Sequence, residues 1–146
     1  MEYYKHFDIV PHDFDLAGAM SSEVKRTLKR FGFGFDFIKR VSVAAYEAEI
    51  NIVIHSFGGY ADFRIQNNRC YLQFIDIGPG IPDIPLAMTP GYSTASEESQ
   101  LNGFGAGMGL INIQKSADEM SLISDPNGTV LKLKFFITED SYHAGS

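Results

Sequence analysis

The sequence predicts an α+β domain in which helices cover one face of a mixed, mostly antiparallel sheet. Two observations predict this class: apolar residues at helical three-to-four spacing occur in separate segments, and two pairs of β-branched and aromatic runs flank strong turn signals. The chain of 146 residues, 45% of them hydrophobic, is long enough for one core. No repeat or linker divides it, so a single domain is expected, with its core over residues 10–137.

The N-terminal part is expected to hold one strand and two helices. Residues 3–10 are rich in aromatic and β-branched types and predict the strand. From Asp15 onward, apolar residues at helical spacing predict a first helix: Leu16, Met20, Val24, Leu28 and Phe31. Asp36 is expected to cap a longer second helix that runs until Gly58 and Gly59, where a left-handed stop costs little.

Two hairpins, a long loop and a third helix are expected in the rest of the chain. "YADFRIQ" and "CYLQFIDIG" flank Asn67-Asn68, and "MSLIS" and "TVLKLKFFI" flank "DPNG". Between these hairpins, residues 77–106 have the length of a lid or binding loop, and "GLINIQKSADE" then predicts a helix. The tail, residues 138–146, is expected to be mobile.

Composition excludes several classes of function. A net charge of -6 argues against the broad positive surface that holds nucleic acid. Cys70 is the only cysteine and the four histidines are scattered, so neither a disulfide scaffold nor a zinc site is indicated. The N-terminus does not have the pattern of a signal peptide, and the most apolar segment carries Glu47, Glu49 and Asn51. A soluble, cytoplasmic protein without membrane or nucleic-acid partners is therefore expected.

The second helix carries a polar stripe. Glu47, Asn51 and His55 are four residues apart, so they share one face of a helix that is otherwise largely apolar. Polar groups on a buried helix need partners, which favours a site, but an ordinary solvated face fits the spacing equally well.

Three glycine-containing stretches could contact a ligand. In "DIGPGIPD", Asp76 ends an apolar strand, and the glycines that follow would let a flat ligand approach, although a Gly-Pro turn explains them too. "GFGAGMGL" fits neither the dinucleotide fingerprint nor the P-loop pattern, yet it leads into a helix N-terminus, which suits an anion. Gly128-Thr129 opens the last strand and by itself indicates only a turn.

The order of these features is more specific than any one of them: E-x-x-x-N on a helix, D-x-G-x-G after a strand, G-x-G-x-G before a helix, and then G-T. This order resembles the ATP-binding domain shared by histidine kinases, a class of chaperones, DNA gyrase and bacterial anti-sigma factor kinases, the GHKL superfamily. The resemblance covers residues 10–137. It implies the Bergerat fold, a two-layer α/β sandwich in which ATP lies between helices and sheet beneath a lid.

The resemblance also implies roles for the residues that match its motifs. Asp76 would accept the adenine amino group, with Thr129 supporting it through water, and Gly78 and Gly80 would leave room for the base. Asn51 would be the side-chain ligand of a Mg²⁺ ion that bridges the phosphates, in keeping with the preference of this cation for oxygen.

Glu47, one turn before Asn51, would be the general base. His55 would contact a phosphate, unless it is only a helix-end histidine packed near the lid. Residues 91–104 would form the lid, and a phosphate loop would follow it: Gly105, Ala106, Gly107, Met108 and Gly109.

Domains of this size resemble the anti-sigma factor and switch-protein serine/threonine kinases, and "DIPLAMTPGYST" looks like the loop of the switch-kinase group. This implies ATP and Mg²⁺ as cofactors and a small antagonist protein as substrate, with a sigma factor or another regulator as a further partner and a homodimer as an option. An alternative is an ATP- or ADP-sensing module that sequesters a partner without phosphoryl transfer. Six basic residues could dock an acidic partner or form a solvated face: Lys25, Arg26, Lys29, Arg30, Lys39 and Arg40.

Overall fold

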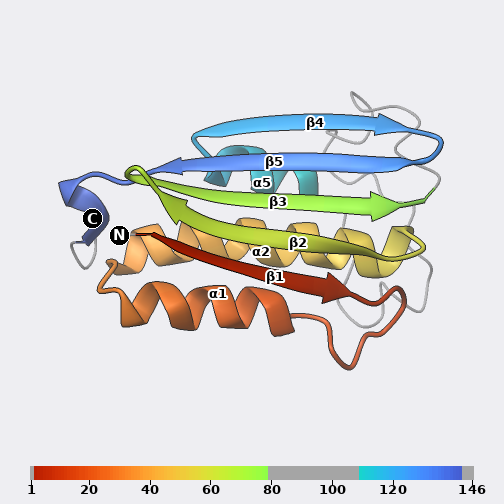
Figure 1. Ribbon diagram of the computed structural model, residues 1–146, viewed down its shortest axis with the longest axis horizontal. Coiled ribbons are helices and arrows are strands. Elements are labelled where there is room, and N and C mark those ends of the chain that lie inside the picture. Colours follow the sequence, from red (N-terminus) through yellow and green to blue (C-terminus); the bar gives the residue numbers. More distant parts are fainter. Residues whose placement is uncertain (1, 79–108, 143–146) are drawn as a thin grey trace.

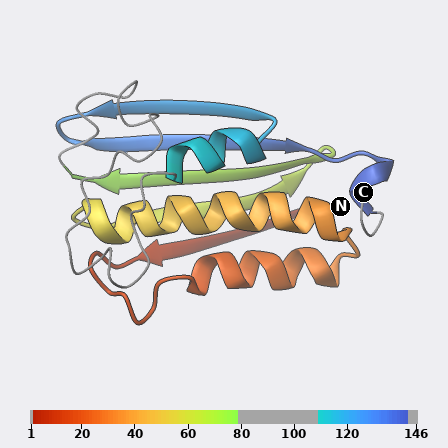
Figure 2. The ribbon, with the colours of Figure 1, turned by 180° about the vertical axis from the view of Figure 1, so that it is seen from behind.

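The fold consists of two layers, a five-stranded sheet and a layer of helices on one of its faces (Figures 1 and 2). The computed structural model describes residues 2–78 and 109–142. Each strand pairing among these residues is antiparallel. The α+β class and the two-layer arrangement predicted from the sequence are confirmed.

The sheet has the strand order β1-β2-β3-β5-β4. Its strands are β1 (Tyr3–Ile9), β2 (Gly59–Gln66), β3 (Arg69–Ile77), β4 (Glu119–Asp125) and β5 (Gly128–Phe136). Both hairpins lie where the turn signals predicted them. Asn67 and Asn68 take φ values of 53° and 59°, as a two-residue hairpin turn requires, and Asn127 donates its backbone N–H to the Asp125 side chain over 2.7 Å.

The first helix begins later than the sequence predicted. Helix α1 spans Ala19–Arg30, whereas helical spacing suggested a start near Asp15. Gly18 interrupts the pattern, because its φ of 96° is left-handed and cannot continue a helix. Leu16, the first residue of the apolar pattern, is therefore outside the helix and 61% exposed.

The second helix, α2 (Phe35–His55), differs from expectation at both ends. Asp36 lies in its first turn rather than at the cap, which is Gly34 without a side-chain hydrogen bond. At the other end the cap is Ser56, which is extended and donates its hydroxyl to the Ile52 carbonyl over 2.7 Å. The left-handed glycine, Gly58, lies in the short link to β2.

The third helix, α5 (Gly109–Ser116), is shorter than predicted. Glu119 already belongs to β4, because the backbone N–H of Asp118 donates to the Lys134 carbonyl on β5 and so leads the chain into the sheet. This helix lies beside α2 on the same face of the sheet, with α1 on the other side of α2 (Figure 2).

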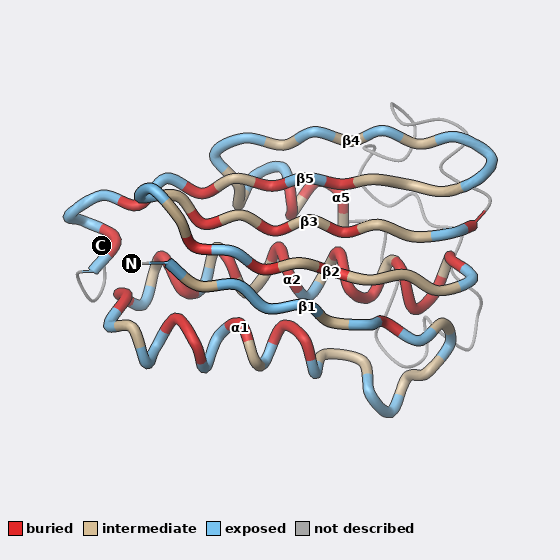
Figure 3. The backbone as a smooth tube through the Cα atoms, in the orientation of Figure 1, coloured by how far each residue is buried: buried red, intermediate tan, exposed pale blue. Residues whose placement is uncertain are grey.

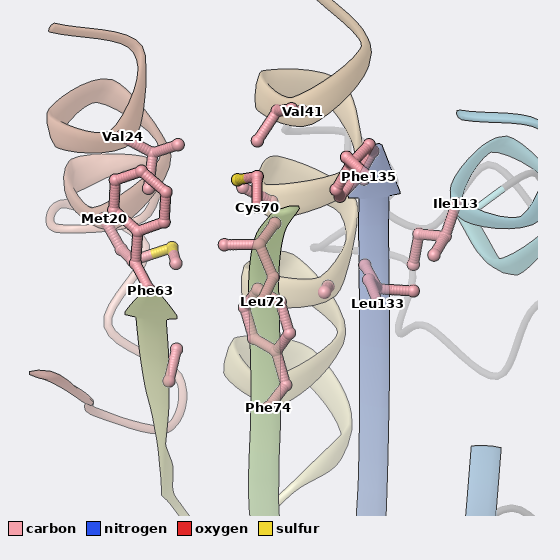
Figure 4. Packing of buried hydrophobic residues seen from close by; sticks show 14 of the residues in the cluster. Met20, Val24, Val41, Phe63, Cys70, Leu72, Phe74, Ile113, Leu133 and Phe135 are labelled. Atoms are coloured by element: carbon pink, nitrogen blue, oxygen red, sulfur yellow. The ribbon is translucent and has the colours of Figure 1, made fainter. Parts of the chain in front are cut away.

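The core lies between sheet and helices. Figure 3 shows buried positions concentrated along α2 and the central strands, and Figure 4 shows how α1, α2 and α5 pack on the inner face of the sheet. Side chains such as Val24, Val41, Phe63, Cys70 and Phe135 are completely buried there. Since α2 is covered by the sheet and by two helices, most of its surface is apolar, and its polar residues stand out.

The first part of the tail, which the sequence predicts to be mobile, contains a short helix that the sequence pattern did not indicate. Glu139–Tyr142 form a short 3-10 helix, η1, beside the start of α2. Its Ser141 carbonyl accepts the backbone N–H of Gly34 over 2.7 Å, and the Tyr142 ring stacks on Phe33 at 4.7 Å between centroids. Over the described ranges, no helix combines the length and the apolar character that a membrane crossing requires.

Candidate functional site

The predicted site residues that the structure describes lie at one end of the molecule. The C-terminal half of α2, the N-terminus of α5, the end of β3 and the start of β5 all lie at this end (Figures 1 and 2). Gly80, the lid over residues 91–104 and the phosphate-loop residues Gly105, Ala106, Gly107 and Met108 lie outside the described residues. The geometry of the site therefore comes from α2, α5, β3 and β5.

Two residues of the polar stripe of α2, Glu47 and Asn51, lie next to the N-terminus of α5. Glu47, Asn51 and His55 are each half-buried, whereas Ala48 and Ile52 beside them are buried. A Cβ atom placed on Gly109 would lie 3.3 Å from Glu47 Oε2 and 3.4 Å from Asn51 Oδ1. Glycine thus lets the helix terminus, with its free N–H groups and positive dipole end, approach a carboxylate and an amide.

Partial burial alters the acid–base behaviour of this stripe. Burial raises the pKa of the Glu47 carboxyl, and a hydrogen bond from the Asn112 side chain on α5 partly offsets the rise. Burial also lowers the pKa of His55, and the charge of nearby His12 lowers it further. The site therefore favours the neutral form of the His55 imidazole. It also makes the Glu47 carboxylate more basic, and so a better proton acceptor.

A second group lies at the sheet edge of the site. Asp76 on β3 is in register with Thr129 on β5, and the Thr129 backbone N–H donates to Asp76 Oδ1 over 3.0 Å. Burial raises the pKa of Asp76, and this hydrogen bond partly offsets the rise. The Thr129 hydroxyl is 2.8 Å from the Ser124 hydroxyl on β4. Within residues 2–78 and 109–142, Asp76 Oδ2 has no hydrogen-bond partner and can accept one from a ligand.

Close backbone approaches hold Asp76 in place. A Cβ atom on Gly128 would lie 2.1 Å from the Asp76 carbonyl oxygen, and one on Gly59 would lie 2.3 Å from the Ile75 carbonyl oxygen, so neither position accepts a side chain. Gly78 is buried against Ser56 at the end of α2, and its N–H donates to the Asn127 carbonyl over 3.2 Å. The strand end that carries Asp76 is thus held between β2, β5 and the end of α2.

Two residues near this site were not identified from the sequence. Asn112 binds Glu47 from α5, and nothing in the local pattern marks it. Glu49, only 3% exposed, accepts backbone N–H groups of Gly18, Met20 and Ser21 over 3.1–3.2 Å. Glu49 caps α1 from a different helix, which replaces the missing side-chain cap of α1. The sequence did offer one signal for Glu49. Its neighbours one turn away in α2 are apolar, and a carboxylate buried among apolar residues needs hydrogen-bond donors.

No cluster of three or more histidine, cysteine, aspartate or glutamate side chains capable of holding a metal occurs in the part of the chain that the structure describes. Among the described residues, Glu47 and Asn51 bring side-chain oxygen atoms next to the α5 N-terminus. They suit a hard cation that takes its remaining ligands from phosphate and water.

Comparison with known proteins agrees with this geometry. The family described as "Histidine kinase-like ATPase domain" matches residues 10–135. The chain is 33% identical to the anti-sigma F factor of Thermoanaerobacter sp. (strain X514), over 70% of this chain and 73% of that protein. It is 32% identical to the serine/threonine-protein kinase RsbT of Bacillus subtilis (strain 168), over 68% and 72% of the two chains.

A solved structure supports the fold. The crystal structure of the RsbU and RsbW domains of a Mycobacterium tuberculosis protein superposes with a TM-score of 0.62 at 14% identity, covering 98% of this chain. The match spans 34% of the length of that larger chain. With a two-layer fold of this kind, a family match over most of the sequence and relatives among regulatory kinases and anti-sigma factors, the chain belongs to the histidine kinase-like ATPase domain family, within its GHKL-type members.

Proposed function

We propose that this protein binds ATP with Mg²⁺ and transfers the γ-phosphoryl group to a serine or threonine of a small antagonist protein. The observation that carries the proposal is the approach of the α5 N-terminus to the Glu47 carboxylate and the Asn51 amide. A helix N-terminus suits phosphate, an amide oxygen suits Mg²⁺, and a carboxylate of increased basicity suits proton removal, so one location combines the groups that phosphoryl transfer requires.

Nucleotide selection is assigned to the sheet edge. Asp76 Oδ2 would accept a hydrogen bond from the adenine amino group while Oδ1 stays bound to the Thr129 backbone. The close packing at Gly59 and Gly128 prevents Asp76 from moving, so the carboxylate is positioned before ATP arrives. Gly78 and Gly80 would leave space for the base.

Phosphate and metal binding are assigned to α2 and to the segment that leads into α5. Asn51 Oδ1 would supply one ligand to Mg²⁺, which neutralises phosphate charge when it is bound. The backbone N–H groups of the glycine-rich loop that ends at Gly109 would hold the phosphates, and His55 would add a contact at the end of the stripe. A lid over residues 91–104 would cover them.

Glu47 is assigned as the general base. Its carboxylate would take the proton of the acceptor hydroxyl, and burial raises its pKa, which makes it a better proton acceptor. The substrate would be a small antagonist protein, by analogy with relatives named as a serine/threonine-protein kinase and as anti-sigma F factors. We also predict a sigma factor or another regulator as a further partner, a homodimer as an option, and a cytoplasmic location.

The names of the anti-sigma relatives favour a second candidate, in which the protein senses ATP or ADP and sequesters a partner without phosphoryl transfer. To test the two, the purified protein is incubated with γ-labelled ATP, Mg²⁺ and the candidate antagonist. We expect label on the antagonist, and we expect Asp76→Asn to weaken ATP binding in a direct titration. ATP binding without label transfer would support sequestration. Unchanged ATP affinity in Asp76→Asn would contradict the adenine assignment.

A further inference from the structure

A pocket lies between α1 and α2, and its wall reaches Glu47 on α2. Its volume is about 270 Å³, and the residues around it include Ser22 and Lys25 from α1 and Ser42, Tyr46 and Glu47 from α2. Pockets that enclose whole small molecules occupy about 300–1,000 Å³. This pocket lies just below that range, so it has room for an amino-acid side chain.

Glu47 connects the pocket with the proposed phosphate site. Its Oε2 atom lies next to Gly109 at the start of α5, and the same side chain forms part of the pocket wall. A group in the pocket and a phosphate at the α5 N-terminus would therefore meet at one carboxylate. A general base in phosphoryl transfer requires this arrangement, because it must contact the acceptor hydroxyl beside the phosphate.

The pocket also offers unused polar groups. The Ser42 hydroxyl is buried and has no hydrogen-bond partner among the residues described. Lys25 is exposed and forms no ion pair with any described residue, whereas Lys5 and Arg26 both pair with Glu23. Buried hydroxyls are normally satisfied, so the Ser42 hydroxyl gains a partner if the pocket wall shifts enough for a polar ligand to reach it.

Helix α1, which forms one wall of the pocket, is net basic, in contrast to the whole chain. Helix α1 contains four basic residues and one acidic residue, while the chain carries a net charge of -6. Lys25 is the basic residue of this helix that lines the pocket. Lys25 therefore offers an acidic group a partner at the α1 side of the pocket, while Glu47 carries the opposite charge at its α2 side.

We propose that this pocket receives the phosphate-accepting serine or threonine of the partner protein, and that Lys25 selects an acidic side chain next to that acceptor. The inference rests on the proposed phosphoryl transfer. The acceptor hydroxyl gives its proton to the Glu47 carboxylate, and its oxygen bonds to the γ-phosphorus of ATP. The bond from that phosphorus to the β–γ bridging oxygen breaks, and ADP leaves.

The test uses two short synthetic peptides that contain a single serine, flanked by glutamates in one and by lysines in the other. Binding is measured by fluorescence anisotropy with a non-hydrolysable ATP analogue present, and transfer is measured with γ-labelled ATP. We expect the acidic peptide to bind about fivefold more tightly, the upper range for one exposed ion pair, and added salt to reduce the difference. Lys25→Glu should reverse the preference.

Two further variants keep the result interpretable. Lys132→Glu makes the same charge change on the outer face of the sheet, so it should retain the wild-type preference. Ser22→Trp places bulk at an exposed position of the pocket rim, so it should abolish binding of both peptides while ATP affinity and melting temperature stay unchanged.

An unaltered peptide preference in Lys25→Glu, or peptide binding retained in Ser22→Trp, would overturn the inference. It would also be overturned if the wild type bound ATP and phosphorylated an antagonist protein but bound neither peptide, in which case the proposed function would stand. If the wild type did not bind ATP, the proposed function itself would fail, and this inference with it.

Discussion

Helix α2 carries two glutamates, two residues apart, in very different environments. Glu49 is 3% exposed, and three backbone N–H groups at the start of α1 saturate its carboxylate. Glu47 is only half-buried, receives a hydrogen bond from Asn112 and lies beside both the α5 N-terminus and the α1–α2 pocket.

The difference shows what separates a structural carboxylate from a reactive one. All hydrogen bonds of Glu49 are made to a rigid helix end, so its charge stabilises the fold and is not accessible to a ligand. Glu47 can still accept hydrogen bonds from a ligand, and burial raises its pKa. Such a carboxylate lowers the stability of the fold, but it is suited to proton transfer.

Replacement of Glu47 by alanine tests the reactive side of this comparison and should have the largest effect. We expect phosphoryl transfer to fall by about 10²–10⁴-fold, because no other group would remove the acceptor proton. ATP affinity should be retained, since the carboxylate binds no part of the nucleotide. Single-turnover transfer from labelled ATP measures the rate. Transfer at the wild-type rate would show that Glu47 is not the base.

Replacement of Glu49 by alanine tests the structural side. It leaves three N–H groups at a buried helix end without an acceptor, so we expect a loss of about 3 kcal/mol in the free energy of unfolding. Chemical denaturation measures the loss. The control is Glu119→Ala, which removes a surface carboxylate paired with Lys134 and should cost less than about 1 kcal/mol. Equal losses in the two variants would refute the capping role.

Substitution of Gly109 by alanine tests whether the approach of α5 to Glu47 matters. The added methyl group would push Glu47 and Asn51 by a few tenths of an ångström, and we expect about a tenfold decrease in transfer. Stability should hardly change, because both neighbours are flexible side chains and alanine favours a helix. A melting curve recorded beside the rate separates the two effects. A normal rate would place the phosphate site elsewhere.

The pH dependence of stability should show the smallest effect. Since burial raises the pKa of Glu47 in the folded chain, the folded state favours its protonated form. This stabilisation is present below the ordinary pKa of a glutamate and is lost as the pH rises through the raised value. Glu47→Gln, which cannot ionise, should therefore melt slightly above the wild type at neutral pH and together with it in acid. The same offset at every pH would contradict the assignment.

Much of the fold was predictable from local signals. The first hairpin follows from Asn67 and Asn68, which tolerate positive φ, the second follows from the "DPNG" turn signal, and α2 follows from its apolar pattern. The ends of the helices were predicted less well. Gly18 sets the start of α1, Ser56 sets the end of α2, and the hydrogen bond of Asp118 to β5 sets the end of α5. The short helix over Glu139–Tyr142 was not predicted, because it depends on contact with the start of α2 and not on the composition of the tail.

The sequence by itself determined the α+β class, the family and the grouping of Glu47, Asn51 and His55, because helical and strand periodicity and motif order are properties of the chain. Only the tertiary structure decided that Gly109 meets Glu47 and Asn51, that Thr129 binds Asp76, and that Glu49 caps α1. These contacts join residues that lie far apart along the chain. They depend on how the helices pack on the sheet, which no local pattern encodes.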